Sequence, residues 1–95
     1  MVKLVEIYEQ PRYTSERPNF TLREVFVNPE HVVCVREDLL ALNHLQEGNL
    51  PEGLMETKFS KIHLNRGQNG IDLVVIGGPE IVQEKLGLRR TLLKG

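Results

Sequence analysis

Short runs of alternating apolar and polar residues, rich in β-branched side chains, recur along the chain and indicate strands. Prolines and polar residues separate these runs, and Pro11 and Pro18 place a loop at residues 9–19. The predicted strands are residues 2–8, 20–27, 31–36, 57–65 and 71–76. The pattern therefore predicts a protein that is mostly β.

Two connections between these strands have the chemistry of tight turns. Asn28, Pro29 and Glu30 separate the second strand from the third, and so short a link predicts that these two strands pair as an antiparallel hairpin. The glycine-rich segment 66–70 separates the fourth strand from the fifth and predicts a second hairpin.

Two short helices are predicted between and after the hairpins. Residues 37–47 place leucines at near-helical spacing, with Asp38 near the start and Gly48 after the end. Residues 81–86 follow Pro79 in a first-turn position and stop at Gly87. In the loop at residues 49–56, three apolar side chains are expected to hold the loop against the body: Leu50, Leu54 and Met55. A mobile loop is the alternative.

The burial of the strands follows from their apolar patterns. Residues 32–35 and 73–76 are continuously apolar, which predicts two central strands covered on both faces. Residues 57–65 alternate, which predicts a half-exposed strand. The predicted fold class is α+β: an antiparallel five-stranded sheet, strongly curled, with two short helices. A small β-barrel is the alternative. We expect residues 1–87 to form one domain and residues 88–95 to form a flexible basic tail.

Charge and composition limit the classes of partner. The 95 residues carry 12 basic and 13 acidic side chains, a net charge of −1, so no global field attracts nucleic acid or an anionic membrane. No apolar run approaches the ~20 residues of a membrane span, and Glu6 and Glu9 interrupt the first ten residues. Cys34 is the single cysteine. A cytoplasmic protein without a membrane partner is expected, and its small core favours a homodimer.

Candidate catalytic or metal-binding residues do not form a recognisable pattern. His31, His44 and His63 lack metal-ligand spacing, and Cys34 lies in an apolar strand where a thiol is usually inert. The turn Gly77-Gly78-Pro79 lacks the residues of a nucleotide-binding loop. No catalytic residue, metal or cofactor is predicted.

A candidate binding face is basic. Alternation places Phe59, Lys61 and His63 on one face of the fourth strand, followed by Arg66 in the turn. Cations beside an aromatic ring could bind single-stranded nucleic acid, and Arg89 and Arg90 of the tail could add contacts. The alternative is an ordinary solvated edge strand whose lysines discourage aggregation.

Several segments together resemble known families. They are residues 24–32, 59–64, 67–75 and 79–82, and they resemble small uncharacterised proteins of tailed bacteriophages. Their layout is also similar to FlbD-like flagellar-operon proteins, which share an asparagine-led strand entry, a glycine-turn hairpin and a closing short helix. Those flagellar proteins lack residues 9–19 and 37–56, so a motility function is not carried over. The resemblance implies a small cytoplasmic accessory protein that acts by binding.

The function expected from these features is binding without catalysis. A protein partner, still unidentified, would contact an exposed edge strand, the loop at residues 49–56 or the basic tail. The alternative function is single-stranded nucleic-acid binding by the basic face.

Overall fold

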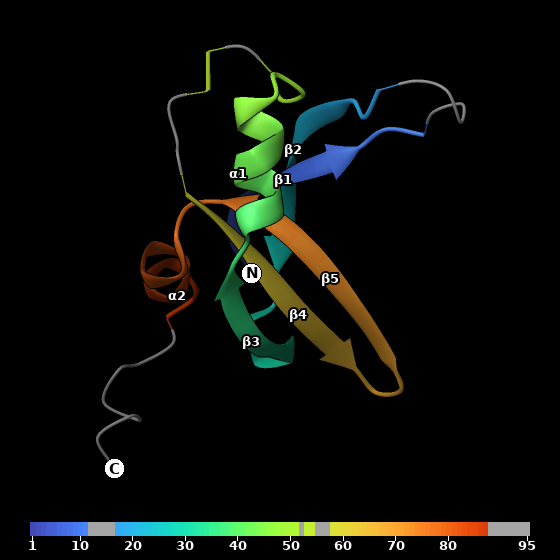
Figure 1. Cartoon of the computed structure of the whole chain (residues 1–95). Helices are drawn as coiled ribbons and strands as arrows, with labels where there is room; N and C mark the ends of the chain where they lie inside the picture. The colour runs from blue at the N-terminus through green and yellow to red at the C-terminus, as the bar shows by residue number, and fades with distance from the viewer. Residues whose placement is uncertain (12–16, 52, 55–57, 88–95) are drawn as a thin grey trace.

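The computed structural model describes residues 1–11, 17–51, 53–54 and 58–87. It contains five strands, two α-helices and one short 3₁₀ helix, η1 (Figure 1). In chain order they are β1 (Val2–Glu9), β2 (Phe20–Val27), η1 (Pro29–His31), β3 (Val32–Glu37), α1 (Leu39–Gln46), β4 (Phe59–Arg66), β5 (Asn69–Ile76) and α2 (Pro79–Leu86).

The strands form one antiparallel sheet in the order β2-β1-β5-β4-β3. The sheet is not closed into a barrel. The predicted α+β class, with five antiparallel strands and two short helices, is confirmed. Both helices have only eight residues, and no helix of the described chain is long and apolar enough to cross a membrane.

The hairpin of β4 and β5 is confirmed. The two strands pair from Phe59↔Ile76 to Arg66↔Asn69, leaving Gly67 and Gln68 as a two-residue turn. Gly67 has a φ of 68°, a positive value at the position where a type II′ turn requires one. A glycine meets that requirement without steric strain.

The predicted hairpin between the second and third strands is wrong. β2 pairs with β1 over eight residues, and β3 pairs with β4, so β2 and β3 are the two edges of the sheet. The Asn28 side chain accepts a hydrogen bond from the Glu30 N–H and caps η1. Because η1 continues the chain through a helical turn, β3 does not fold back to pair with β2. For the same reason His31 lies in η1, and β3 is an edge strand rather than a central one.

The short connection between opposite edges requires the sheet to curl. Four spacings of about 4.8 Å would separate the edges of a flat five-stranded sheet by about 19 Å. The chain from Val27 to Val32 has five steps, three of them in η1, and reaches only about 13 Å. The predicted curl is therefore a geometric necessity of this topology.

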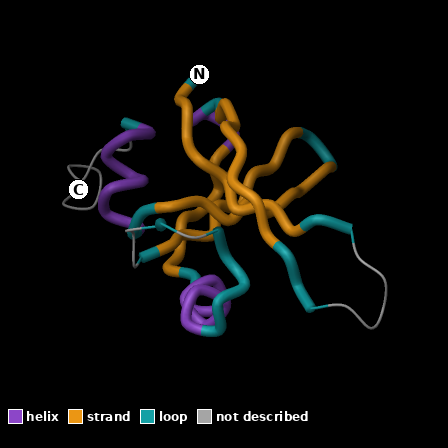
Figure 2. Tube along the Cα trace, turned by 90° about the horizontal axis from the view of Figure 1, so that it is seen from above, coloured by secondary structure: helices purple, strands orange, loops and turns teal. Residues whose placement is uncertain are grey.

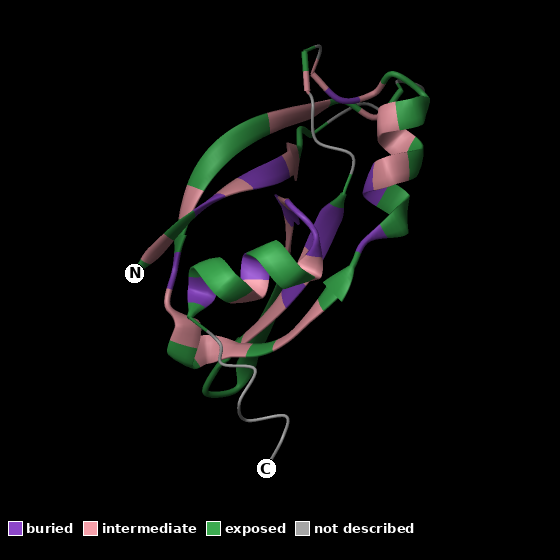
Figure 3. Ribbon diagram, turned by 90° about the vertical axis from the view of Figure 1, so that its left-hand side faces the viewer, coloured by how far each residue is buried: buried purple, intermediate pink, exposed green. Residues whose placement is uncertain are grey.

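The concave face of the curled sheet contains the main core. Leu4, Ile62 and Val75 from the inner strands pack with Val27 from the β2 edge. The partly buried side chains Val32 and Val35 bring the β3 edge into the same cluster, whose remaining buried members are Val82 and Leu86 of α2. Figure 3 shows α2 alternating between buried and exposed positions as it crosses this face.

A second core lies on the outer face of the sheet. Ile7 and Phe59 pack there with Ala41 of α1 and with Leu50 of the following loop. The Asp38 carboxylate caps α1 by accepting hydrogen bonds from the N–H groups of Leu40 and Ala41. Figure 2 shows α1 and α2 at separate positions around the sheet. Because each face has a helix, β4 is buried on both faces at its start.

One buried hydrogen bond fixes the turn between β5 and α2. The hydroxyl of Ser60, which has no exposed surface, donates to the carbonyl oxygen of Gly77 at 2.7 Å. The Gly77 N–H donates to the carbonyl oxygen of Lys58 at 2.9 Å. Gly77 has a φ of 112°, which strongly favours glycine. These bonds orient α2 towards the concave face.

Truncating the buried end of α2 should destabilise the protein. Leu86 is 4% exposed, and we expect Leu86→Ala to lower the free energy of unfolding by about 2 to 5 kcal/mol. Ile81→Ala, in the same helix at a position 50% exposed, should change it by less than about 0.5 kcal/mol. Urea unfolding of both variants provides the measurement. Equal effects would contradict the assignment of α2 to the concave core.

Removing the Ser60 hydroxyl should destabilise the β5–α2 turn. Ser60→Ala leaves the buried Gly77 carbonyl without this donor, and we expect a loss of about 1 to 3 kcal/mol. Thermal unfolding followed by circular dichroism measures the loss. Ser60→Thr, which keeps a hydroxyl, is the comparison, and an unaltered midpoint in Ser60→Ala would show that the bond contributes nothing.

Candidate binding surfaces

The edge of β2 is a regular strand whose second side is unoccupied in the described chain. β2 has eight residues without proline and pairs only with β1. Leu22 is 37% exposed and Phe26 is 62% exposed, and their spacing places both side chains on the outer face. Phe26 also borders the groove of the concave face described below. Glu24 lies between these two residues in β2, and its Oε2 forms an ion pair with Lys3 Nζ of the neighbouring strand β1 at 3.3 Å. The edge thus offers backbone groups beside two apolar side chains.

The opposite edge, β3, is less regular. It has six residues, and its register with β4 shifts between Val32 and Cys34. Helix α2 also contacts β3. A bulge and a neighbouring helix both hinder the addition of another strand. Of the two edges, β2 is the better template for strand pairing.

A groove of about 450 Å³ opens on the concave face, at the end bounded by η1 and the β4–β5 turn. Its apolar wall includes Val25, Leu64 and Leu73. Its polar lining residues are Glu6, Arg23, Asn28, His31, Arg66 and Asn69. An apolar hollow of this size with a few polar groups is the usual form of a ligand site.

An ion pair forms part of the wall of this groove. The Arg23 Nε donates to the Glu6 carboxylate at 2.8 Å, and the Glu6 side chain is 10% exposed. The Arg23 guanidinium also stacks over the ring of Tyr8, 3.6 Å from its centroid. Hydrogen bonding to Glu6 raises the pKa of Arg23 above its ordinary value. The sequence contains a signal for this pair: alternation along the first strand places the acidic Glu6 on the same face as the apolar Leu4, where a carboxylate needs a partner.

The basic face expected from the sequence does not assemble as expected. Phe59 has no exposed surface because α1 and the following loop cover it, so the expectation that its ring is available for base stacking is wrong. Arg66 lines the concave groove, on the face opposite to Lys61 and His63. Arg89 and Arg90 lie outside the described residues.

Lys61 and His63 instead border a shallow hollow on the outer face. It has a volume of about 360 Å³ and includes Arg36, Cys34 and Asp72 in its lining. His63 Nδ1 donates to Asp72 Oδ1 at 2.6 Å. This hydrogen bond lowers the pKa of the Asp72 carboxyl, and the charges of Lys61 and Arg36 lower it further. The strongest acceptor of the hollow is thus already occupied by a histidine.

Cys34, His63 and Asp72 lie in one row across three neighbouring strands. A thiol and an imidazole in such a row could form a nucleophilic pair if Nε2 faced the sulfur. A Cβ built at Gly70 of β5 would lie 3.4 Å from His63 Nε2, so the ring leans towards β5 and away from β3. The described residues contain no group of three or more side chains arranged to hold a metal ion.

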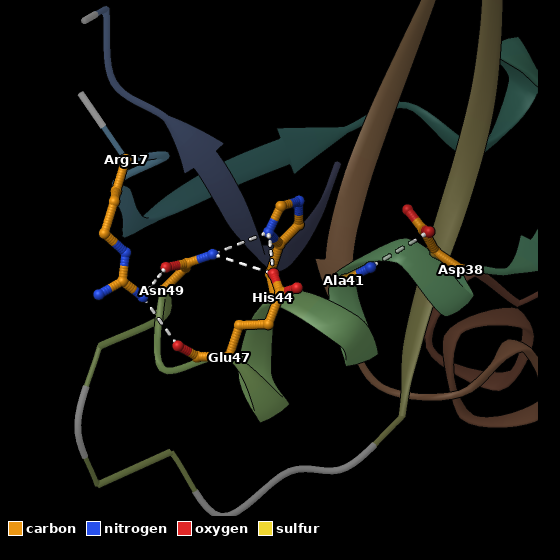
Figure 4. Close-up of polar contacts among 6 residues, drawn as sticks. All are labelled: Arg17, Asp38, Ala41, His44, Glu47 and Asn49. Carbon is orange, nitrogen blue, oxygen red and sulfur yellow. Dashed lines mark hydrogen bonds and ion pairs between the residues drawn. The ribbon is translucent and has the colours of Figure 1, made fainter. Parts of the chain in front are cut away.

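A polar cluster attaches the loop after α1 to the chain before β2 (Figure 4). Arg17 Nη2 donates to the Glu47 carbonyl oxygen at 2.9 Å and to Asn49 Oδ1 at 2.7 Å. Asn49 Nδ2 lies 3.2 Å from His44 Nδ1. Leu50 and Leu54 pack on the outer core, as the sequence predicted, while Met55 lies outside the described residues. The side chains of this cluster already bind one another.

The contact between His63 and Asp72 should make a small contribution to stability that depends on pH. The lowered pKa of the Asp72 carboxyl keeps this group charged in the folded protein. The contribution to stability is therefore fully present above the ordinary aspartate pKa of about 4. The contribution is lost as the pH falls through the lowered value. We therefore expect Asp72→Asn to be less stable than the wild type at pH 6, and the difference to shrink as the pH falls below about 4. Urea unfolding across this range measures the difference, and a gap that is constant with pH would contradict this account.

Comparisons with protein-family models, with curated proteins and with solved structures found no match, so the resemblance to phage and flagellar proteins stays a prediction.

Proposed function

We propose that this protein acts without catalysis, by binding another protein through addition of a strand to the free edge of β2. The observation that carries the proposal is the edge itself. It consists of eight residues in regular extended conformation, paired on one side, with Leu22 and Phe26 exposed beside it.

Strand addition uses two kinds of contact at such an edge. The outward N–H and C=O groups of β2 would pair with the backbone of the partner and provide affinity. Alternate side chains of the partner would lie beside Leu22 and Phe26 on the outer face and provide specificity. The ion pair of Lys3 and Glu24 leaves little net charge between the two apolar side chains. The surface therefore favours a partner strand that is apolar on this face.

The charges of the described chain favour protein over nucleic acid as the partner. Phe59 is buried, so the fourth strand offers no stacked aromatic platform. Asp72 lies among Lys61, His63 and Arg36 and reduces their attraction for phosphate. Binding of nucleic acid by the outer face is the alternative, and the nuclease treatment described below distinguishes it from protein binding.

The proposal retains a cytoplasmic setting and an accessory role. A single cysteine suits a reducing compartment, and the resemblance to phage proteins suggests a bacterial host. A second copy of the chain is one possible partner strand, because a free edge can pair with its own symmetry mate.

The test compares lysine variants in capture experiments from a bacterial lysate. Leu22→Lys and Phe26→Lys place a charge beside the β2 edge, and we expect each to reduce capture of the partner about tenfold. Val33→Lys, at the β3 edge, and Ile71→Lys, in the groove, are exposed controls that should retain capture. Circular dichroism confirms that every variant folds, and the native mass of the bait detects a second copy.

Two results would contradict the proposal. Capture that disappears after nuclease treatment would indicate nucleic acid as the partner. Equal capture by the β2 variants and their controls would place the interface elsewhere. Slower hydrogen exchange of the β2 amides in the complex would support strand addition directly.

A further inference from the structure

The concave groove differs from the β2 edge in both shape and chemistry. It is a hollow of about 450 Å³, within the range of about 300 to 1,000 Å³ typical of small-molecule sites. We infer that the groove binds a small amphipathic molecule with one aliphatic chain and one carboxylate. This site goes beyond the proposed function, because strand addition at β2 does not require a ligand in the groove.

The apolar wall of the groove favours a ligand with an aliphatic chain. Val25, Leu64 and Leu73 pack against the concave core, yet each keeps part of its surface exposed. Val82 and Leu86 of α2 complete the buried cluster but do not line the groove. The wall thus remains an apolar surface that an aliphatic chain could cover, and its burial would favour binding.

The polar groups at the mouth of the groove favour a carboxylate as the head group of the ligand. Arg66 and Asn69 face each other as the last residue pair of the β4–β5 hairpin and both line the groove. Among the described residues, no acid forms an ion pair with Arg66. Its guanidinium and the amide of Asn69 can both donate hydrogen bonds, and His31 borders the same space.

The acidic group of the groove does not oppose an anionic ligand. Glu6 is bound by Arg23, so the two side chains together carry no net charge. Among the charged side chains of the groove, Arg66 then leaves an excess of one positive charge, apart from any charge on His31. A carboxylate would neutralise this excess, whereas a cationic head group would add to it.

A small molecule fits the groove better than a peptide. The groove is lined by residues of β2, η1, β4 and β5 and by Glu6 of β1. The backbones of β1, β4 and β5 are paired on both sides within the sheet, so among these strands only β2 keeps free backbone groups. A peptide backbone would find few free partners there, while a single aliphatic chain needs none. The chemistry therefore favours a carboxylate of the fatty-acid type.

Three ligands with a common ten-carbon chain test this inference. Decanoate, decanol and decyltrimethylammonium, each below the concentration of micelle formation, are titrated into the ¹⁵N-labelled full chain. We expect decanoate to produce saturable shifts in the amides that line the groove and to bind most tightly. The cation should bind most weakly, because its charge has the same sign as that of Arg66.

Two variants separate the head-group contact from the chain contact. Arg66→Gln should weaken decanoate about fivefold and leave decanol unchanged, because only the carboxylate uses the charge. Lys61→Gln removes a cation from the outer face and should alter neither ligand. Ile71→Ser, at the groove rim, should weaken both ligands and keep their order of affinity.

Several outcomes would overturn the inference. Equal affinity for the three ligands would show an apolar surface without head-group preference. Shifts that do not saturate, or that spread over both faces, would show adsorption of a detergent. An unchanged decanoate affinity in Arg66→Gln would remove the charge argument. Phe26 borders both surfaces, whereas Leu22 does not line the groove. Partner capture by Leu22→Lys and ligand binding by Arg66→Gln therefore let each proposal fail alone.

Discussion

The connection between β2 and β3 is the constraint on which the rest of this fold depends. It joins the two edges of a five-stranded sheet through a single turn of 3₁₀ helix, and this link is too short for a flat sheet. The sheet must curl until the edges approach each other. Side chains from both edges then reach one concave core, which α2 covers at one end. The groove is the part of that concavity which α2 leaves open.

Local polar contacts orient the helices on the curled sheet. Asp38 caps α1 and also donates its backbone N–H to the carbonyl oxygen of Phe59, so the helix starts at a fixed place beside β4. Ser60, the next residue of β4, holds the Gly77 turn that leads into α2. Adjacent residues of one strand thus set the positions of helices on opposite faces. This arrangement explains why Phe59 and Ser60 are both buried.

The surfaces left for binding are those that these contacts do not use. Polar groups near α1 bond to one another, and His63 is held by Asp72. The β2 edge and the groove differ from them, because one offers unpaired backbone groups and the other offers uncovered apolar side chains beside Arg66. The two surfaces suit different partners: a strand at the edge and a small amphiphile in the hollow.

The sequence by itself determined the local elements of this protein. Alternation located the strands, Asp38 and Gly87 marked helix ends, and the glycine turn at Gly67 specified the second hairpin, since these features depend on neighbouring residues alone. Strand order, and with it the burial of Phe59 and the separation of Arg66 from Lys61, was decided by the tertiary structure. The physical reason is that pairing β2 with β1 across a long loop, rather than with β3 across a short one, depends on which core the whole chain can bury. A local sequence pattern holds no information about which of these two pairings of β2 buries the larger core.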